Sequence, residues 1–324
     1  MLELTDVCLR PGQGSEVEAG VFEHSFAPGE ITVVLGANHS GKTDLCRLVA
    51  GLNTRAGGTV LLDGVELTGV PTQQRPVSMV YQAFVNYPNL TVAQNIASPL
   101  RAQGKQAAEI KASVADLSGR LGIDQLLSRF PHELSGGQQQ RLAIARALAK
   151  QARVLLLDVP LVNLDFKLRE ALAIELRELL QATATIVIYT SSDPRDAFGL
   201  ADQLLLLDRG GKLQTGTPMQ IYAIPANFRA MELLAEPGVN FFHHRGARCG
   251  LRPEHVKVGS ESTAHDALQF DLRVTACETN GDESFIHGRM SEFEWVVRSS
   301  GMVSNVMPGD SLVVTAAPAD VVRF

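Results

Sequence analysis

An apolar run that leads into a glycine-containing loop and then into a helical pattern constrains the fold of this chain most. Residues 31–35 (ITVVL) are the apolar run, residues 36–43 (GANHSGKT) the loop, and residues 44–48 (DLCRL) the start of the helix. The loop matches G-x-x-x-x-G-K-[ST], in which backbone amides and a helix N-terminus face a polyphosphate. A strand, loop and helix in this order predict an α/β domain that binds phosphate groups.

Each residue type in this loop has a physical reason to be there. Gly36 and Gly41 permit the tight backbone, the Lys42 ammonium can reach terminal phosphates, and the Thr43 hydroxyl can face Mg²⁺. We expect nucleotide contacts from the whole loop and from the residue after it, namely Gly36, Ala37, Asn38, His39, Ser40, Gly41, Lys42, Thr43 and Asp44.

A carboxylate follows a second apolar run. Residues 154–157 (VLLL) lead directly to Asp158. A carboxylate at the end of a buried parallel strand fits the acidic residue that positions Mg²⁺ beside a nucleotide. Because many strands end in Asp, the signal is strong only together with the Lys42 loop. The pair predicts a magnesium site that includes Thr43 and Asp158.

A second glycine motif, LSGGQ at residues 134–138, precedes a helical pattern that runs to residue 149. Ser135 suits the N-cap of that helix, and two glycines leave backbone amides bare beside its N-terminus. One chain with two anion-binding surfaces suggests a site that two chains share. The residues expected to face the other chain's nucleotide are Leu134, Ser135, Gly136, Gly137 and Gln138.

Strand-like and helical patterns divide the chain into parts. Apolar runs alternate with helical patterns up to about residue 236, which favours a largely parallel sheet covered by helices. Residues 92–149 show no convincing strand and predict a helical subdomain. After about residue 236, short strand patterns separated by glycine and polar turns predict a small β domain. We expect a nucleotide-binding domain at 1–236 and a C-terminal β domain at 237–324.

Bulk composition excludes several classes of protein. The net charge is -6, from 29 basic and 35 acidic residues, which provides no basic surface for nucleic acid. No apolar stretch approaches the ~20 residues that span a bilayer. The start, MLELTDVCLR, lacks the basic and apolar regions of a signal peptide. We expect a protein of the cytosol.

Taken together, these motifs resemble the ATP-binding subunits of ABC transporters, most closely the maltose-type importers of carbohydrates and polyols. The matching segments are GANHSGKT, VYQAFVNYPNLTVAQNIASPL, LSGGQQQR, LLLDVPLVNLD and GLRPEHV. The resemblance implies the P-loop fold of an ABC nucleotide-binding domain with a helical insertion, followed by a small OB-like β-barrel. It also implies ATP and Mg²⁺ as cofactors and a head-to-tail dimer. In that dimer Gln82 would contact Mg²⁺ and the γ-phosphate, and Asp165 would reach across to the other chain.

The same resemblance implies partners and a location. Importers of this type work with transmembrane permease subunits, a second ATPase subunit and, indirectly, an external solute-binding protein. Such a chain lies on the cytoplasmic face of the membrane. Tyr87 would lie near the groove for the permease, either as a contact or as packing. A sugar, polyol or glycerol phosphate is the expected solute class, with glycerol-like polyols favoured.

The chain departs from the family pattern around its own nucleotide. Val159 stands where the family has the Glu that polarises water, and Ser192 where it has the switch His. A positioned base contributes ~10²–10⁴-fold to a rate, and valine cannot act as one. Asp44 replaces a hydroxyl residue, and residues 10–14 lack the usual adenine-stacking aromatic. We therefore expect no intact catalytic residue in this site.

Three hypotheses remain at this stage. The chain is the degenerate half of a heterodimer whose LSGGQ completes the active site of an unlike partner. It is a self-sufficient homodimeric ATPase that uses a different base, Asp193 or Asp165. Or it is a non-hydrolysing, ATP-binding regulatory module. The intact LSGGQ motif and the segment after Gln82 favour the first.

Overall fold

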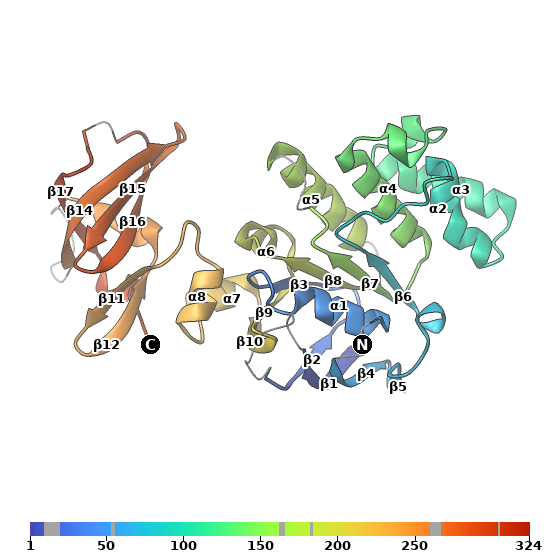
Figure 1. The fold of residues 1–324 in the computed structure, drawn as a ribbon, viewed down its shortest axis with the longest axis horizontal. Coiled ribbons are helices and arrows are strands. Elements are labelled where there is room, and N and C mark those ends of the chain that lie inside the picture. Colours follow the sequence, from blue (N-terminus) through green and yellow to red (C-terminus); the bar gives the residue numbers. More distant parts are fainter. Residues whose placement is uncertain (10–19, 53–55, 162–165, 182–183, 260–266, 304) are drawn as a thin grey trace. The chain divides into compact units, whose positions relative to one another are not determined.

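A six-stranded sheet carries the phosphate-binding segment at the end of an inner strand (Figure 1). The computed structural model describes residues 1–9, 20–52, 56–161, 166–181, 184–259, 267–303 and 305–324. The strand order is β10-β9-β3-β8-β7-β6, parallel from β9 to β6, with β10 antiparallel at one edge. Its strands are β3 (Ile31–Leu35), β6 (Val77–Val80), β7 (Val154–Asp158), β8 (Ile186–Ser191), β9 (Gln203–Asp208) and β10 (Gly211–Gly216).

One hydrophobic core joins this sheet to helix α1 (Lys42–Ala50) and to a four-stranded antiparallel sheet. Alternate residues of β7 and β8 enter this core, as the period of two along a strand requires. The other faces of these strands are buried as well, so the runs read as continuously apolar. The second sheet has the order β2-β1-β4-β5, with β1 (Leu2–Cys8), β2 (Phe22–Phe26), β4 (Gly57–Leu62) and β5 (Val65–Glu66).

Residues 92–149, which the structure describes throughout, contain helices and no strand, as the sequence predicts. The helices are α2 (Val92–Ala102), α3 (Ala107–Arg120) and α4 (Gly136–Ala149), with 3₁₀ turns at Asp124–Leu126 and Pro131–Glu133. Pro99 lies inside α2 instead of ending it. Proline lacks the N–H that would bond the carbonyl of Asn95. The Ser98 hydroxyl donates to that carbonyl at 2.7 Å, so the carbonyl still has a hydrogen-bond partner.

The first compact unit spans Met1–Ile221 and contains further helical elements. Helices α5 (Phe166–Gln181) and α6 (Pro194–Leu200) contact each other, and α6 also contacts β3 and β8. Helix α7 (Pro218–Ala223) and a 3₁₀ turn at Thr72–Gln74 complete the set. None of the helices in the described part of the chain is long and apolar enough to cross a bilayer.

The second compact unit, Tyr222–Phe324, is mainly antiparallel β structure around Trp295, which is 1% exposed. Its sheets have the orders β11-β12-β18 and β13-β17-β14-β15-β16. The elements are α8 (Phe228–Leu233), β11 (Asn240–His244), β12 (Ala247–Leu251), β13 (Lys257–Val258), β14 (Leu268–Thr279), β15 (Glu283–Met290), β16 (Phe293–Ser300), β17 (Ser311–Ala316) and β18 (Val322–Arg323), with 3₁₀ turns at Pro253–His255 and Pro318–Asp320.

These observations confirm the predicted fold class, an α/β domain with a helical insertion and a small C-terminal β domain. The sequence boundary between the two compact units falls after Ile221, whereas the expected domain boundary lies at 236/237. The 15 residues between these points include α8, which the structure groups with the β unit. The domain boundary at 236/237 stays a prediction.

Candidate nucleotide-binding site

The predicted phosphate loop lies between β3 and α1, at the carboxyl edge of the parallel sheet. The Lys42 ammonium is buried and donates to the carbonyls of Gly36 at 2.7 Å and Ala37 at 2.8 Å. Burial lowers the pKa of Lys42 from its ordinary value, against the opposing effect of the Asp158 carboxylate. The loop therefore curls around a cation that a phosphate group would further stabilise.

Two glycines set the shape of this loop. Gly41 precedes α1 with φ 102°, a left-handed conformation that disfavours other residues, and no side chain caps the helix there. A Cβ at Gly36 would collide with the Leu207 carbonyl and the Ser40 hydroxyl. Bare amides at a helix N-terminus suit an anion.

Ser40 provides an independent test of whether the loop fits a phosphate. Its side chain is 2% exposed, and its Oγ has no hydrogen-bond partner within the described parts of the chain. A buried hydroxyl without a partner costs free energy, so such an atom calls for a ligand or a bound water. The loop thus has donors and an orphaned hydroxyl where polyphosphate oxygens would bind.

Asp158 ends β7 beside this loop. Its Oδ1 accepts hydrogen bonds from the Thr43 hydroxyl at 3.0 Å and the Thr190 hydroxyl at 2.9 Å. The two predicted magnesium ligands, Thr43 and Asp158, are therefore brought together. Oxygen ligands of this type suit Mg²⁺, which binds proteins through one or two carboxylates plus phosphate oxygens. The residues present fit the cation.

Asp44, in the first turn of α1, brings an acidic side chain to the position where the family has a hydroxyl residue. Burial raises its pKa, the Arg47 guanidinium lowers it, and the Asp158 charge raises it again, with a net upward shift. The side chain is thus easier to neutralise than a free aspartate, although it lies next to Thr43.

Gln82 follows β6, the strand next to β7. The register pairs Val80 with Leu157, so Gln82 and Asp158 leave the sheet at the same edge. The Gln82 side chain is exposed, and no hydrogen bond joins it to Asp158 in the described chain. Its role toward Mg²⁺ stays a prediction.

The LSGGQ motif forms the start of α4. Ser135 is the N-cap, with its hydroxyl accepting from the Gln138 amide at 3.4 Å and the Gln138 side chain accepting from the Ser135 amide at 3.0 Å. Gly136 is exposed, and no heavy atom lies within 4 Å of the place where its Cβ would be. Hydrogen bonds among the described residues do not join this motif to the phosphate loop. It is thus an exposed helix N-terminus, separate from that loop.

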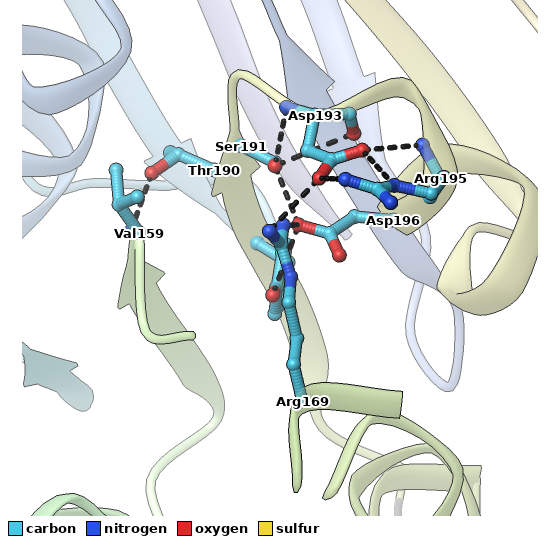
Figure 2. A network of polar contacts seen from close by, with 8 residues as sticks. Val159, Arg169, Thr190, Ser191, Asp193, Arg195 and Asp196 are labelled. Carbon is cyan, nitrogen blue, oxygen red and sulfur yellow. Dashed lines mark hydrogen bonds and ion pairs between the residues drawn. The ribbon is translucent and has the colours of Figure 1, made fainter. Parts of the chain in front are cut away.

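Val159 holds an unusual backbone conformation directly after Asp158. Its φ is 46°, in the left-handed region that β-branched residues avoid. The Val159 N–H donates to the Thr190 hydroxyl at 2.9 Å, and its aliphatic side chain can neither accept a proton nor bind water (Figure 2). The position therefore supplies a strained backbone and no base.

Charged side chains hold the end of β8 and the segment that follows it. Ser191 donates to Asp196 at 2.5 Å, while Arg169 of α5 pairs with Asp193 at 2.8 Å and Asp196 at 2.7 Å (Figure 2). Ser192, at the switch position, is exposed. The strand end and the start of α6 are thus tied to α5.

Asp193 is poorly suited to replace the missing base. Arg195 donates to its Oδ1 at 3.1 Å and to its Oδ2 at 2.9 Å. Burial alone would raise its pKa, but the hydrogen bonds from Arg195 and the charge of Arg169 lower it overall. A carboxylate held in this way is a weak proton acceptor. Asp165, the other candidate, and residues 10–14 lie outside the described residues.

Sequence reasoning missed Thr190, Ser191 and Arg169. A readable signal existed for the first two, because the ends of neighbouring parallel strands meet at one edge. The ends of β7 and β8 could therefore have been predicted to lie side by side, with Asp158 next to a hydroxyl of β8. Arg169 gave no such signal, since an arginine on an amphipathic helix is usually exposed.

Comparisons with known protein families and relatives agree with this geometry. The profile of the family described as ABC transporter matches residues 21–162, and that of the TOBE domain matches residues 249–324. The sn-glycerol-3-phosphate import ATP-binding protein UgpC of Rhodopseudomonas palustris strain HaA2 is 35% identical over an alignment of 317 positions, which covers 94% of this chain and 86% of the relative. UgpC 3 of Agrobacterium fabrum strain C58 is 31% identical over an alignment of 341 positions, which covers 98% of this chain and 96% of the relative.

A solved structure agrees at the level of fold. The ATP-binding cassette MJ0796, determined as a dimer in a post-hydrolysis state with ADP and Pi, aligns with a TM-score of 0.60. The alignment covers 67% of this chain and 99% of that one, at 23% sequence identity. The likeness is therefore one of fold.

Proposed function

This chain belongs to the family of ABC transporter ATP-binding proteins, and we propose that it energises a solute importer as the hydrolytically impaired half of an unlike ATPase pair. The observation that carries the proposal is the contrast at Asp158 and Val159. Asp158 accepts a hydrogen bond from Thr43, the other proposed magnesium ligand, whereas Val159 offers no base and has a left-handed backbone.

ATP and Mg²⁺ are the cofactors of this family, and the residues at the sheet edge fit them. The Lys42 loop would hold the β- and γ-phosphates, with Thr43 and Asp158 toward the cation. Bound Mg²⁺ neutralises charge on the phosphate oxygens. This chain's own groups would bind and orient the nucleotide, and the Val159 side chain cannot take a proton from water.

The exposed LSGGQ motif supports a second role. Ser135 and the bare amides of Gly136 and Gly137 would face the ATP of the other subunit, as the family's head-to-tail dimers imply. An unlike partner that has its own base would then hydrolyse ATP at the site that this chain completes. The site with Lys42 would hold ATP as a slow or structural ligand.

A cavity of about 300 Å³ beside β6, α2 and α4 supports docking to a permease. Tyr87 lies at this cavity, 50% exposed, with the Arg146 guanidinium 4.6 Å from its ring centroid. Arg146 also donates to the Val85 carbonyl, so the segment after Gln82 is fixed against α4. We propose that Tyr87 contacts a permease subunit at the cytoplasmic face of the membrane.

The solute class follows from the relatives alone. Two of them are named for import of sn-glycerol-3-phosphate. We propose a glycerol phosphate, polyol or sugar as the solute, selected by a solute-binding protein and the permease subunits. No described residue of this chain is required to contact it.

The pairing proposal is tested in the assembled transporter, with the unlike ATPase and permease subunits expressed together with this chain. Ser135→Ala should lower ATP turnover about tenfold or more, the loss expected when a hydrogen bond to a charged group is removed. Lys42→Ala should lower it far less. Thr91→Ala is the matched control, because Thr91 caps α2 through the same capping box. Equal losses for Ser135→Ala and Lys42→Ala would rule out the asymmetric pair.

A further inference from the structure

Thr190, at the end of β8, joins the carboxylate and the strained residue of the site. Its side chain is fully buried, at 0% exposed. Its hydroxyl accepts from the Val159 N–H at 2.9 Å (Figure 2). The same hydroxyl donates to Asp158 Oδ1 at 2.9 Å. None of the family motifs in the sequence includes this residue.

The direction of the hydroxyl proton follows from these two contacts. A hydroxyl has one proton to donate and two lone pairs that accept. Because the Val159 N–H occupies a lone pair, the proton is directed at Asp158. The Thr43 hydroxyl donates to the same oxygen at 3.0 Å. Both described hydrogen bonds therefore hold Oδ1, and Oδ2 is the oxygen that the described side chains leave for a ligand.

We propose that Thr190 is a positioning residue that orients Asp158 for Mg²⁺ and thereby sets the metal dependence of ATP binding. The inference rests on the proposed ATP-binding function and names a further residue of the same site. Thr190 does not touch the nucleotide itself; it acts through Asp158. The hydrogen bond from the Val159 N–H to Thr190 links Val159, with its left-handed backbone, to the same carboxylate.

The neighbouring residue provides a contrast within one strand. Ser191 donates to Asp196 and accepts from the Asp193 amide at 3.0 Å, so it belongs to the charge network with Arg169. Side chains alternate between the faces of a strand. Two adjacent hydroxyls of β8 thus serve two separate networks, of which only that of Thr190 contains Asp158.

The test is calorimetric titration of the purified full chain with ATP, once with Mg²⁺ and once with EDTA. The ratio of the two dissociation constants measures the metal's contribution. Thr190→Val keeps the shape and removes the hydroxyl, and it should reduce that ratio about tenfold, since a hydrogen bond to a carboxylate is lost. ATP affinity in EDTA should stay within twofold. Thr190→Ser should retain the ratio, and Ser191→Ala, the matched control, should leave it unchanged.

Further variants keep the inference open to failure. In an Asp158→Asn background, adding Thr190→Val should produce no further change in the ratio, because residues that act as a unit are not additive. If Thr190→Val does not fold, Thr190→Ala must show the same selective loss. An unchanged ratio, or an equal loss with and without Mg²⁺, overturns the inference. If the unmutated chain binds no ATP, with or without Mg²⁺, the proposed function is overturned as well.

Discussion

The side chains at the carboxyl edge of the parallel sheet fall into two sets, a first half and a second half of the site, that differ in what they can do. Beside β3 and β7, Lys42, Thr43 and Asp158 present a cation, a hydroxyl and a carboxylate to one space. Beside β8, Asp193 and Asp196 are held by arginines of α5 and α6. Binding and cleavage depend on different groups, so a chain can keep the groups that bind ATP and lose those that cleave it.

The strongest way to break this contrast is to restore the missing groups. The double variant Val159→Glu with Ser192→His should raise MgATP hydrolysis of the concentrated chain by about 10²-fold, the contribution of a positioned base. Steady-state phosphate release measures it, with Lys42→Ala in the same background as the control. No gain would mean that the loss of activity lies elsewhere.

The charge network of the second half should matter for stability rather than for nucleotide binding. Arg169→Ala leaves Asp196, which is 6% exposed, without its ion pair, and should lower the free energy of unfolding by about 2–3 kcal/mol. Urea denaturation measures the change. Arg120→Ala is the control, because its pair with Asp116 is exposed and should change stability by about 0.5 kcal/mol or less.

The ATP affinity of Arg169→Ala is measured as well, and it should stay within twofold of that of the natural chain. A large loss of affinity with little loss of stability would show that the two halves of the site are not separate.

The first half should respond to loss of its cation. Lys42→Ala should weaken MgATP binding about tenfold to thirtyfold, as expected for a charged hydrogen bond. Lys150→Ala is a close control for titration calorimetry, because burial lowers the pKa of both lysines and Lys150 also donates to a backbone carbonyl, that of Val77 at 2.7 Å. Similar losses for both variants would contradict the assignment of the loop.

The smallest expected effect concerns acid. The pKa of Asp193 lies below its ordinary value of 3.8, so its ion pairs stabilise the fold above that pH and are lost as pH falls through the folded value. Asp193→Asn, which can keep the helix cap, should cost about 1 kcal/mol at pH 7. The difference from the natural chain should shrink below pH 3.8. Thermal melts across pH measure it, and a constant difference would contradict the assignment.

The sequence predicts the groups that follow from local pattern. The strand, loop and helix at residues 31–48 and the N-cap at Ser135 are confirmed, because each depends on neighbouring residues alone. Helix α5 (Phe166–Gln181) also depends on a local pattern, because its apolar residues recur at helical spacing. The fold class follows from the alternation of such segments.

Contacts between distant segments could not be predicted in the same way. Thr190 meets Asp158 across 32 positions, and Arg169 meets Asp196 across 27. Nothing in a helical pattern marks which arginine will pair with a buried carboxylate. The left-handed φ of Val159 is also invisible in sequence, because valine is the residue type that would be expected least there.

We propose that this chain binds MgATP but cannot cleave it alone. The most direct measurement is MgATP hydrolysis by the purified chain at high concentration, beside Lys42→Ala as the control for contaminating activity. We predict equal rates for the two, with ATP binding shown separately by calorimetry for the natural chain. A clear rate that Lys42→Ala abolishes would contradict the claim and make a homodimeric ATPase with a different base the better account.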